Sequence, residues 1–101
     1  MRVTVQILSQ QLKKRMGWED KKTEETYFFE GNSIADLFKV VRDSEGKSFY
    51  DRFMDKDSII SRSYIHFQGA ISYLGPEDMK RPLQDGSKLA ILGQLAFCGG
   101  G

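Results

Sequence analysis

The stretch from residue 33 to residue 46 restricts the fold more than any other part of this chain. Its apolar residues recur at i, i+3, i+4 and i+7, which is the spacing of an apolar stripe on a helix: Ile34, Leu37, Phe38 and Val41. Ser33 stands where an N-cap is expected, and Asp36 complements the helix dipole in the first turn. The pattern predicts a helix that begins after Ser33 and stops by Gly46. Such a helix needs a second layer against which to bury its stripe.

The segments on both sides of this helix have the patterns of strands. Alternating apolar residues predict strands over 1–8 and 62–68, with a short return strand at 71–73. Aromatic residues predict a strand over 24–30, and an Asp-Gly turn precedes a compact apolar strand over 88–92. A weaker helical pattern covers the aromatic residues of 49–54, whereas the polar stretches 13–22 and 77–82 are expected to be connections.

This order of elements predicts an α+β domain in which one mixed sheet of four to five strands packs on one main helix, with a short extra helix. The two terminal strands are candidates to pair at the centre of the sheet. The core is predicted to consist of nine residues: Val3, Val5, Ile7, Ile34, Leu37, Phe38, Val41, Leu89 and Ile91. We expect residues 1–95 to form the domain and residues 96–101 to form a flexible glycine tail.

Composition excludes several functional classes. The chain has 101 residues, which predicts a single domain, and its net charge of +1 gives no general attraction to nucleic acid or anionic membranes. No apolar run approaches the ~20 residues that span a bilayer, and one cysteine cannot form an internal disulfide, so a cytoplasmic location is expected. With His66 as the only histidine, neither a zinc site nor a Cys-His or Ser-His-Asp catalytic set is expected.

The chain ends in three consecutive glycines, Gly99, Gly100 and Gly101, directly after Cys98. Such an end can simply be flexible, because glycine has the largest backbone entropy. It also carries an unhindered carboxylate that can thread a narrow enzyme channel. Reaction of that carboxylate with ATP would give an acyl-adenylate, which sulfide or a persulfide can open to a thiocarboxylate. The globular part would supply recognition, and a partner would supply the catalytic groups.

Several motifs together resemble the β-grasp (ubiquitin-like) sulfur-carrier family, which includes the molybdopterin synthase small subunit and the thiamin sulfur carrier. Residues 3–8 and 12–17 are similar to the first strand of the family and its leucine-glycine segment. Residues 33–37 (Ser-Ile-Ala-Asp-Leu) are similar to its helix start, and residues 82–91 (Pro-Leu-Gln-Asp-Gly-Ser-Lys-Leu-Ala-Ile) to its approach to the last strand. The chain lacks the proline-rich link before the diglycine and has an inserted segment between the main helix and Arg62.

The resemblance implies a protein co-substrate and not an enzyme, with no bound cofactor. A ubiquitin-activating-type adenylyltransferase would use ATP and a sulfur donor to convert the terminal glycine, and a biosynthetic enzyme would accept the sulfur. The Phe97–Gly100 end is similar to carriers of amino-acid or siderophore biosynthesis, some of which a zinc metalloprotease trims. On that basis Gly100 is the activated residue, or Gly101 if the chain is mature as it stands.

Exposed apolar residues on the sheet face away from the helix would dock the activating enzyme. The candidates are Phe67, Ile71, Leu92, Leu95 and Phe97, with Cys98 either a small apolar tail residue or a thiol near the activated carbonyl. Three alternatives stay open: a molybdopterin synthase small subunit, a ubiquitin-like modifier that forms isopeptide bonds, and an interaction module whose glycines do no chemistry.

Overall fold

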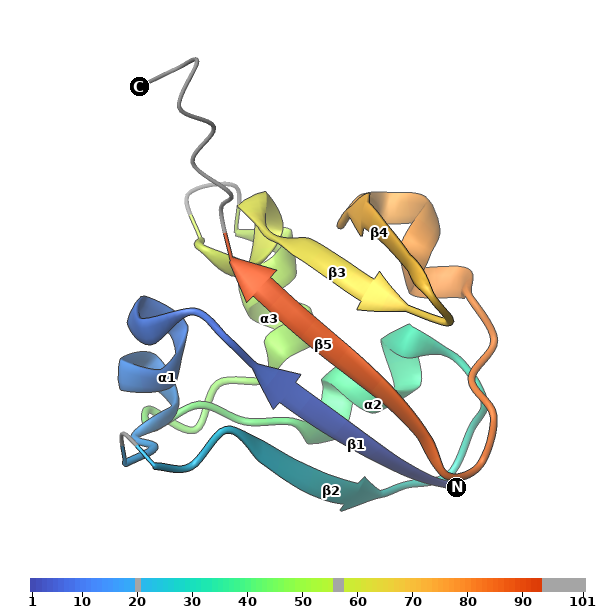
Figure 1. The fold of residues 1–101 in the computed structure, drawn as a ribbon, viewed down its shortest axis with the longest axis horizontal. Coiled ribbons are helices and arrows are strands. Elements are labelled where there is room, and N and C mark those ends of the chain that lie inside the picture. The colour runs from blue at the N-terminus through green and yellow to red at the C-terminus, as the bar shows by residue number, and fades with distance from the viewer. Residues whose placement is uncertain (20, 56–57, 94–101) are drawn as a thin grey trace.

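The computed structural model describes residues 1–19, 21–55 and 58–93, which fold into a sheet with helices packed on one of its faces (Figure 1). The strands are β1 (Arg2–Ile7), β2 (Glu24–Phe28), β3 (Tyr64–Phe67), β4 (Ala70–Tyr73) and β5 (Ser87–Gly93). The helices are α1 (Gln10–Met16), α2 (Ile34–Val40) and α3 (Phe49–Met54), with 3₁₀ helices η1 (Ile60–Arg62) and η2 (Pro76–Lys80). The α+β class and the mixed sheet, which has five strands within these ranges, are therefore confirmed.

The sheet has the strand order β2-β1-β5-β3-β4, with the two terminal strands at its centre. β1 and β5 run parallel, in a register that pairs Val5 with Leu89 and Ile7 with Ile91. The other neighbours are antiparallel. Leu89, Ala90 and Ile91 are buried in succession, as is usual for a strand at the centre of a sheet. The prediction that the terminal strands pair centrally is confirmed.

Helix α2 begins where the sequence predicts but ends earlier. Ser33 and Asp36 form a reciprocal capping box, in which the Ser33 hydroxyl accepts from the Asp36 N–H and the Asp36 carboxylate accepts from the Ser33 N–H. The helix ends at Val40 and not near Gly46, because Val41 adopts an extended conformation and its carbonyl accepts from the Phe49 N–H. All nine predicted core residues, including those of α2, have no exposed surface, so the predicted core is confirmed.

Helix α1 corrects the prediction of a polar connection over residues 13–22. The Ser9 hydroxyl caps it by accepting from the Leu12 N–H, and Gly17 ends it in the left-handed conformation at φ +73°. Leu12 and Met16, one turn apart, are buried on the core side. A second correction concerns residues 77–82, where η2 forms with Pro76 at its start.

A buried polar network secures the inserted segment that follows α2. The Asp43 carboxylate accepts from the Arg52 Nε at 2.6 Å and from the backbone N–H groups of Glu45 and Lys47 at 2.9 and 3.0 Å. Burial alone would raise the pKa of Asp43, but these hydrogen bonds outweigh it and hold that pKa below its ordinary value. The network fixes the turn at residues 43–47 against α3, which confirms the weaker helical prediction.

Candidate functional site

One half of the uncovered face of the sheet carries the exposed apolar side chains of the three strands β3, β4 and β5. Figure 1 looks onto this face, with α2 and α3 behind the sheet. The strand registers place four apolar or aromatic side chains on it, here called the β4-side patch: Tyr64, Ile71, Tyr73 and Leu92. The exposed His66, the register partner of Ile71, lies on the same face. Ile71 is 59% exposed and Tyr73 is 51% exposed, whereas Tyr64 and Leu92 are half-buried. The patch lies beside the end of β5.

The aromatic part of the β4-side patch is held in place before any partner binds. The rings of Tyr64 and Tyr73 meet edge to face, with centroids 5.5 Å apart. The Tyr73 hydroxyl donates to the Ser61 carbonyl at 3.0 Å, which ties the edge strand to η1. Leu8, 49% exposed, adjoins Leu92 if the parallel register of β1 and β5 is continued by one residue. A fixed apolar surface of this kind reduces the entropy that a docking partner must lose.

The other half of the same face is polar. On β1 and β2 the hydroxyls of Thr4 and Thr26 are hydrogen-bonded at 2.9 Å, and Lys88 of β5 pairs with Glu24 at 3.0 Å. Phe28, which is 75% exposed, lies at the far end of β2. The apolar surface of the uncovered face is therefore concentrated on the β3–β4 side.

The end of β5 is fixed by a contact that only glycine permits. Gly93 has φ +76°, and a Cβ there would lie 2.7 Å from the Cβ of Ser9. Ser9 is itself held by its role as the N-cap of α1. The position of the end of β5 is therefore set by the packing of Gly93 on the start of α1. The predicted site residues Leu95, Phe97, Cys98, Gly99, Gly100 and Gly101 lie outside the described residues.

The structure separates the described docking candidates. Ile71 and Leu92 lie on the uncovered face as predicted. Phe67 does not, because it is only 4% exposed and its register partner on β5 is the buried Leu89. The assignment of Phe67 to the docking surface is therefore wrong. The sequence analysis missed Tyr64 and Tyr73, although Tyr64 alternates with the buried Ile65 and so had to face the opposite side.

The comparisons with known proteins add no further constraint. No protein-family model, no curated protein and no solved structure matches this chain. Among the described residues, no group of three His, Cys, Asp or Glu side chains is placed to hold a metal ion. No helix in the described ranges has the length and apolar character needed to cross a membrane.

Proposed function

We propose that this protein is a β-grasp sulfur carrier, whose C-terminal glycine is adenylated by a ubiquitin-activating-type enzyme and converted to a thiocarboxylate. The strand order supports the fold part of the proposal, because a mixed sheet with parallel terminal strands at its centre and a helix across one face is the β-grasp arrangement. The observation that supports the functional part is the succession of a central last strand, its fixed end at Gly93 and the Gly99–Gly101 sequence beyond it.

The chemistry needs little from the carrier itself. A carboxylate oxygen of the terminal glycine attacks the α-phosphorus of ATP, which releases pyrophosphate and leaves an acyl-adenylate. Hydrosulfide then attacks the acyl carbon and AMP leaves, so that a thiocarboxylate forms without any change in the carrier's oxidation state. All catalytic groups belong to the activating enzyme, and the carrier contributes docking and positioning. In this proposal the β4-side patch is the docking surface, and a sulfur-accepting biosynthetic enzyme uses the same end of the molecule.

Intact-mass measurement tests the proposal directly. The chain is incubated with ATP, the activating enzyme and sulfide, and we expect its mass to rise by the difference between sulfur and oxygen. Two forms, one ending at Gly100 and one at Gly101, identify the activated residue, and a form lacking Gly99–Gly101 is the matched control that should stay unchanged. If neither glycine-ended form gains the mass of the exchange, the sulfur-carrier proposal is rejected. High-mass conjugates to lysines of other proteins would indicate a ubiquitin-like modifier instead.

A further inference from the structure

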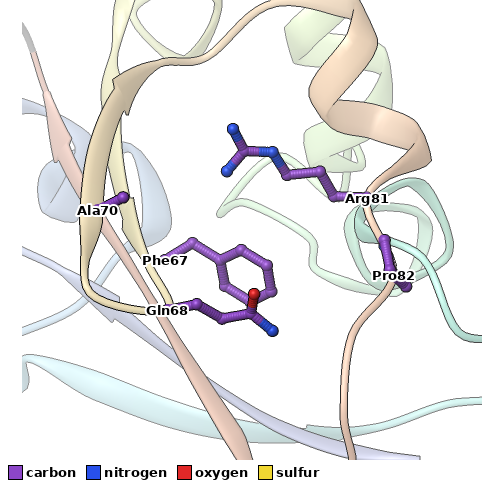
Figure 2. A pocket seen from close by; sticks show the side chains of 5 residues that line it. All are labelled: Phe67, Gln68, Ala70, Arg81 and Pro82. Carbon is purple, nitrogen blue, oxygen red and sulfur yellow. The ribbon is translucent and has the colours of Figure 1, made fainter.

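A cavity of about 340 Å³ lies between the β3–β4 hairpin and the segment that follows η2, away from the β4-side patch (Figure 2). Five residues line it: Phe67, Gln68, Ala70, Arg81 and Pro82. Its volume falls in the range of small-molecule sites, which begins at roughly 300 Å³. Its lining also follows their usual composition, with an apolar surface and a few polar groups that converge on it.

Arg81 presents hydrogen-bond donors to this cavity. Its Nε is paired with the buried carboxylate of Asp78 at 2.9 Å, and the other oxygen of Asp78 accepts from the Gly75 N–H. This pairing fixes the guanidinium group while it occupies only one of its edges. Figure 2 shows the group extending into the space between the hairpin and Pro82. In the part of the chain that the structure describes, no acceptor bonds to its two Nη atoms, so a planar acceptor can bind there.

Gln68 is the second polar group, and its backbone is unusual. The two-residue turn between β3 and β4 has positive φ at both positions, +53° at Gln68 and +83° at Gly69. Turns of this type favour asparagine at the first position, because its short side chain can hydrogen-bond to the nearby backbone in the left-handed conformation. Glutamine at that position extends the carboxamide one methylene further, and Figure 2 shows it along one side of the Phe67 ring, with the guanidinium of Arg81 on the other side. A strained residue aimed at a cavity is an independent indication of a binding role.

We propose that this cavity binds a small carboxylate that has a flat apolar body. The carboxylate accepts hydrogen bonds from the Nη atoms of Arg81 and from the carboxamide N–H of Gln68. The apolar body packs on the apolar lining of the cavity, which Phe67, Ala70 and Pro82 supply. A phosphate dianion fits less well, because the cavity offers one cation and the carboxylate of Asp78 lies beside it.

Benzoate is the probe that tests this site, with the full-length chain followed by nitrogen–proton correlation NMR. We expect saturable shifts of the Gln68 and Arg81 side-chain signals, with a dissociation constant of about 1 mM. Benzamide keeps the ring without the charge, and acetate keeps the charge without the ring. Each should bind about tenfold more weakly. Equal shifts with benzamide, or no saturable shift at these two residues, would overturn the proposal.

Two variants separate binding from folding. Gln68→Asn suits the turn better and shortens the amide, so we expect unchanged or higher thermal stability and benzoate affinity reduced by at least about threefold. Arg81→Lys keeps the ion pair with Asp78 but loses the planar fork, and its affinity should fall about tenfold. Lys80→Gln is the matched control, since it removes a neighbouring exposed charge outside the cavity and should leave affinity unchanged. Wild-type affinity in both cavity variants would reject the assignment.

Discussion

The two margins of the sheet, formed by the edge strands β2 and β4, carry opposite kinds of exposed side chains. At the β2 margin the polar groups satisfy one another, through the Thr4–Thr26 hydrogen bond and the Lys88–Glu24 and Lys22–Glu25 ion pairs. At the β4 margin the uncovered face carries apolar and aromatic side chains around the exposed His66, and the covered face borders a cavity. β2 and β4 are both edge strands, so the contrast does not come from the sheet topology. It comes from the side chains that each edge strand carries.

This difference indicates where the molecule has surface left to bind a partner. Exposed ion pairs in water add little stability, and the β2 margin has a single exposed large apolar side chain among the described residues, Phe28 at its end. Clustered exposed apolar side chains on a small domain mark an interaction surface. β5 lies between the two margins, and its end at Gly93 packs on the start of α1. The comparison therefore predicts that partner binding responds to changes at the β4 margin and not to changes at the β2 margin.

The largest effect is expected at Gly93, where β5 ends between the two margins. Gly93→Ala places a side chain at φ +76° with its Cβ 2.7 Å from that of Ser9. We expect a loss of about 3 kcal/mol in the free energy of unfolding, from backbone strain together with overpacking. Chemical denaturation monitored by circular dichroism measures it.

Gly46 supplies the matched control for this prediction. Its φ is nearly the same, +81°, but an added Cβ would meet no atom within 4 Å. Gly46→Ala should therefore cost about 1 kcal/mol, the conformational part alone. The difference between the two variants isolates the Ser9 contact, and Ser9→Gly should recover part of the loss in Gly93→Ala. Equal losses at the two glycines would show that the end of β5 is not fixed by α1.

The second effect concerns docking at the β4 margin. Ile71→Asp places a charge at the most exposed side chain of the β4-side patch, and we expect the affinity for the proposed activating enzyme to fall about 30-fold, or about 2 kcal/mol. Thr26→Asp is the matched change at the β2 margin, where the neighbouring Thr4 hydroxyl can donate to the new carboxylate. Calorimetric titration compares the two, with unchanged melting temperatures as the check on folding. Equal losses of affinity in the two variants would show that partner binding does not distinguish the β4 margin from the β2 margin.

Much of this fold could be predicted from the sequence because its strongest signals are local. The Ser33 capping box and the apolar stripe of α2 both lie within or next to a single helix. The alternation of residues in β1 shows directly which face of that strand is buried. Helix α1 was missed, because Lys13, Lys14 and Arg15 in its last turn obscure the Leu12–Met16 pair. The flanking signals, Ser9 as N-cap and Gly17 as left-handed C-cap, were present and would have identified it.

The site was less predictable because it depends on register. Alternation shows that Tyr64 and Phe67 face opposite sides of β3, but it does not say which of them faces the helices. That choice is made by pairing with β5, which sets Phe67 opposite Leu89. The cavity was not predictable for the same reason, because Gln68 and Arg81 line one space only once the fold has placed the β3–β4 hairpin opposite the end of η2.

A smaller effect tests whether the aromatic residues of the β4 margin stabilise the fold as well as offering a surface. Tyr73→Ala removes the ring contact with Tyr64 and the hydrogen bond to the Ser61 carbonyl, and should cost about 1 kcal/mol in thermal or chemical denaturation. Tyr73→Phe keeps the ring and should lose about half of that. At the other margin, Phe28→Ser changes a side chain that is 75% exposed and should stay within about 0.5 kcal/mol of the wild type. A loss of stability from Phe28→Ser larger than that from Tyr73→Ala would show that the exposed aromatic residue of the β2 margin, and not that of the β4 margin, stabilises the fold.

The smallest effect belongs to the ion pairs of the β2 margin. Lys22 donates to the Glu25 carboxylate at 2.7 Å, and this hydrogen bond, against the opposing effect of partial burial, lowers the pKa of Glu25 in the folded protein. Both side chains are about 40% exposed, so Glu25→Gln should cost no more than about 0.5 kcal/mol at neutral pH, and less in high salt.

The pH dependence of this loss identifies its origin. Because the folded pKa of Glu25 lies below the unfolded value of about 4.3, its contribution is fully present above that value and disappears as the pH falls through the folded pKa. Wild type and Glu25→Gln should therefore converge in stability at acidic pH. A pH-independent loss as large as that of Tyr73→Ala would mean that Glu25 stabilises the β2 margin through packing and not through its charge. The description of the β2 margin as a surface of paired polar groups would then be wrong.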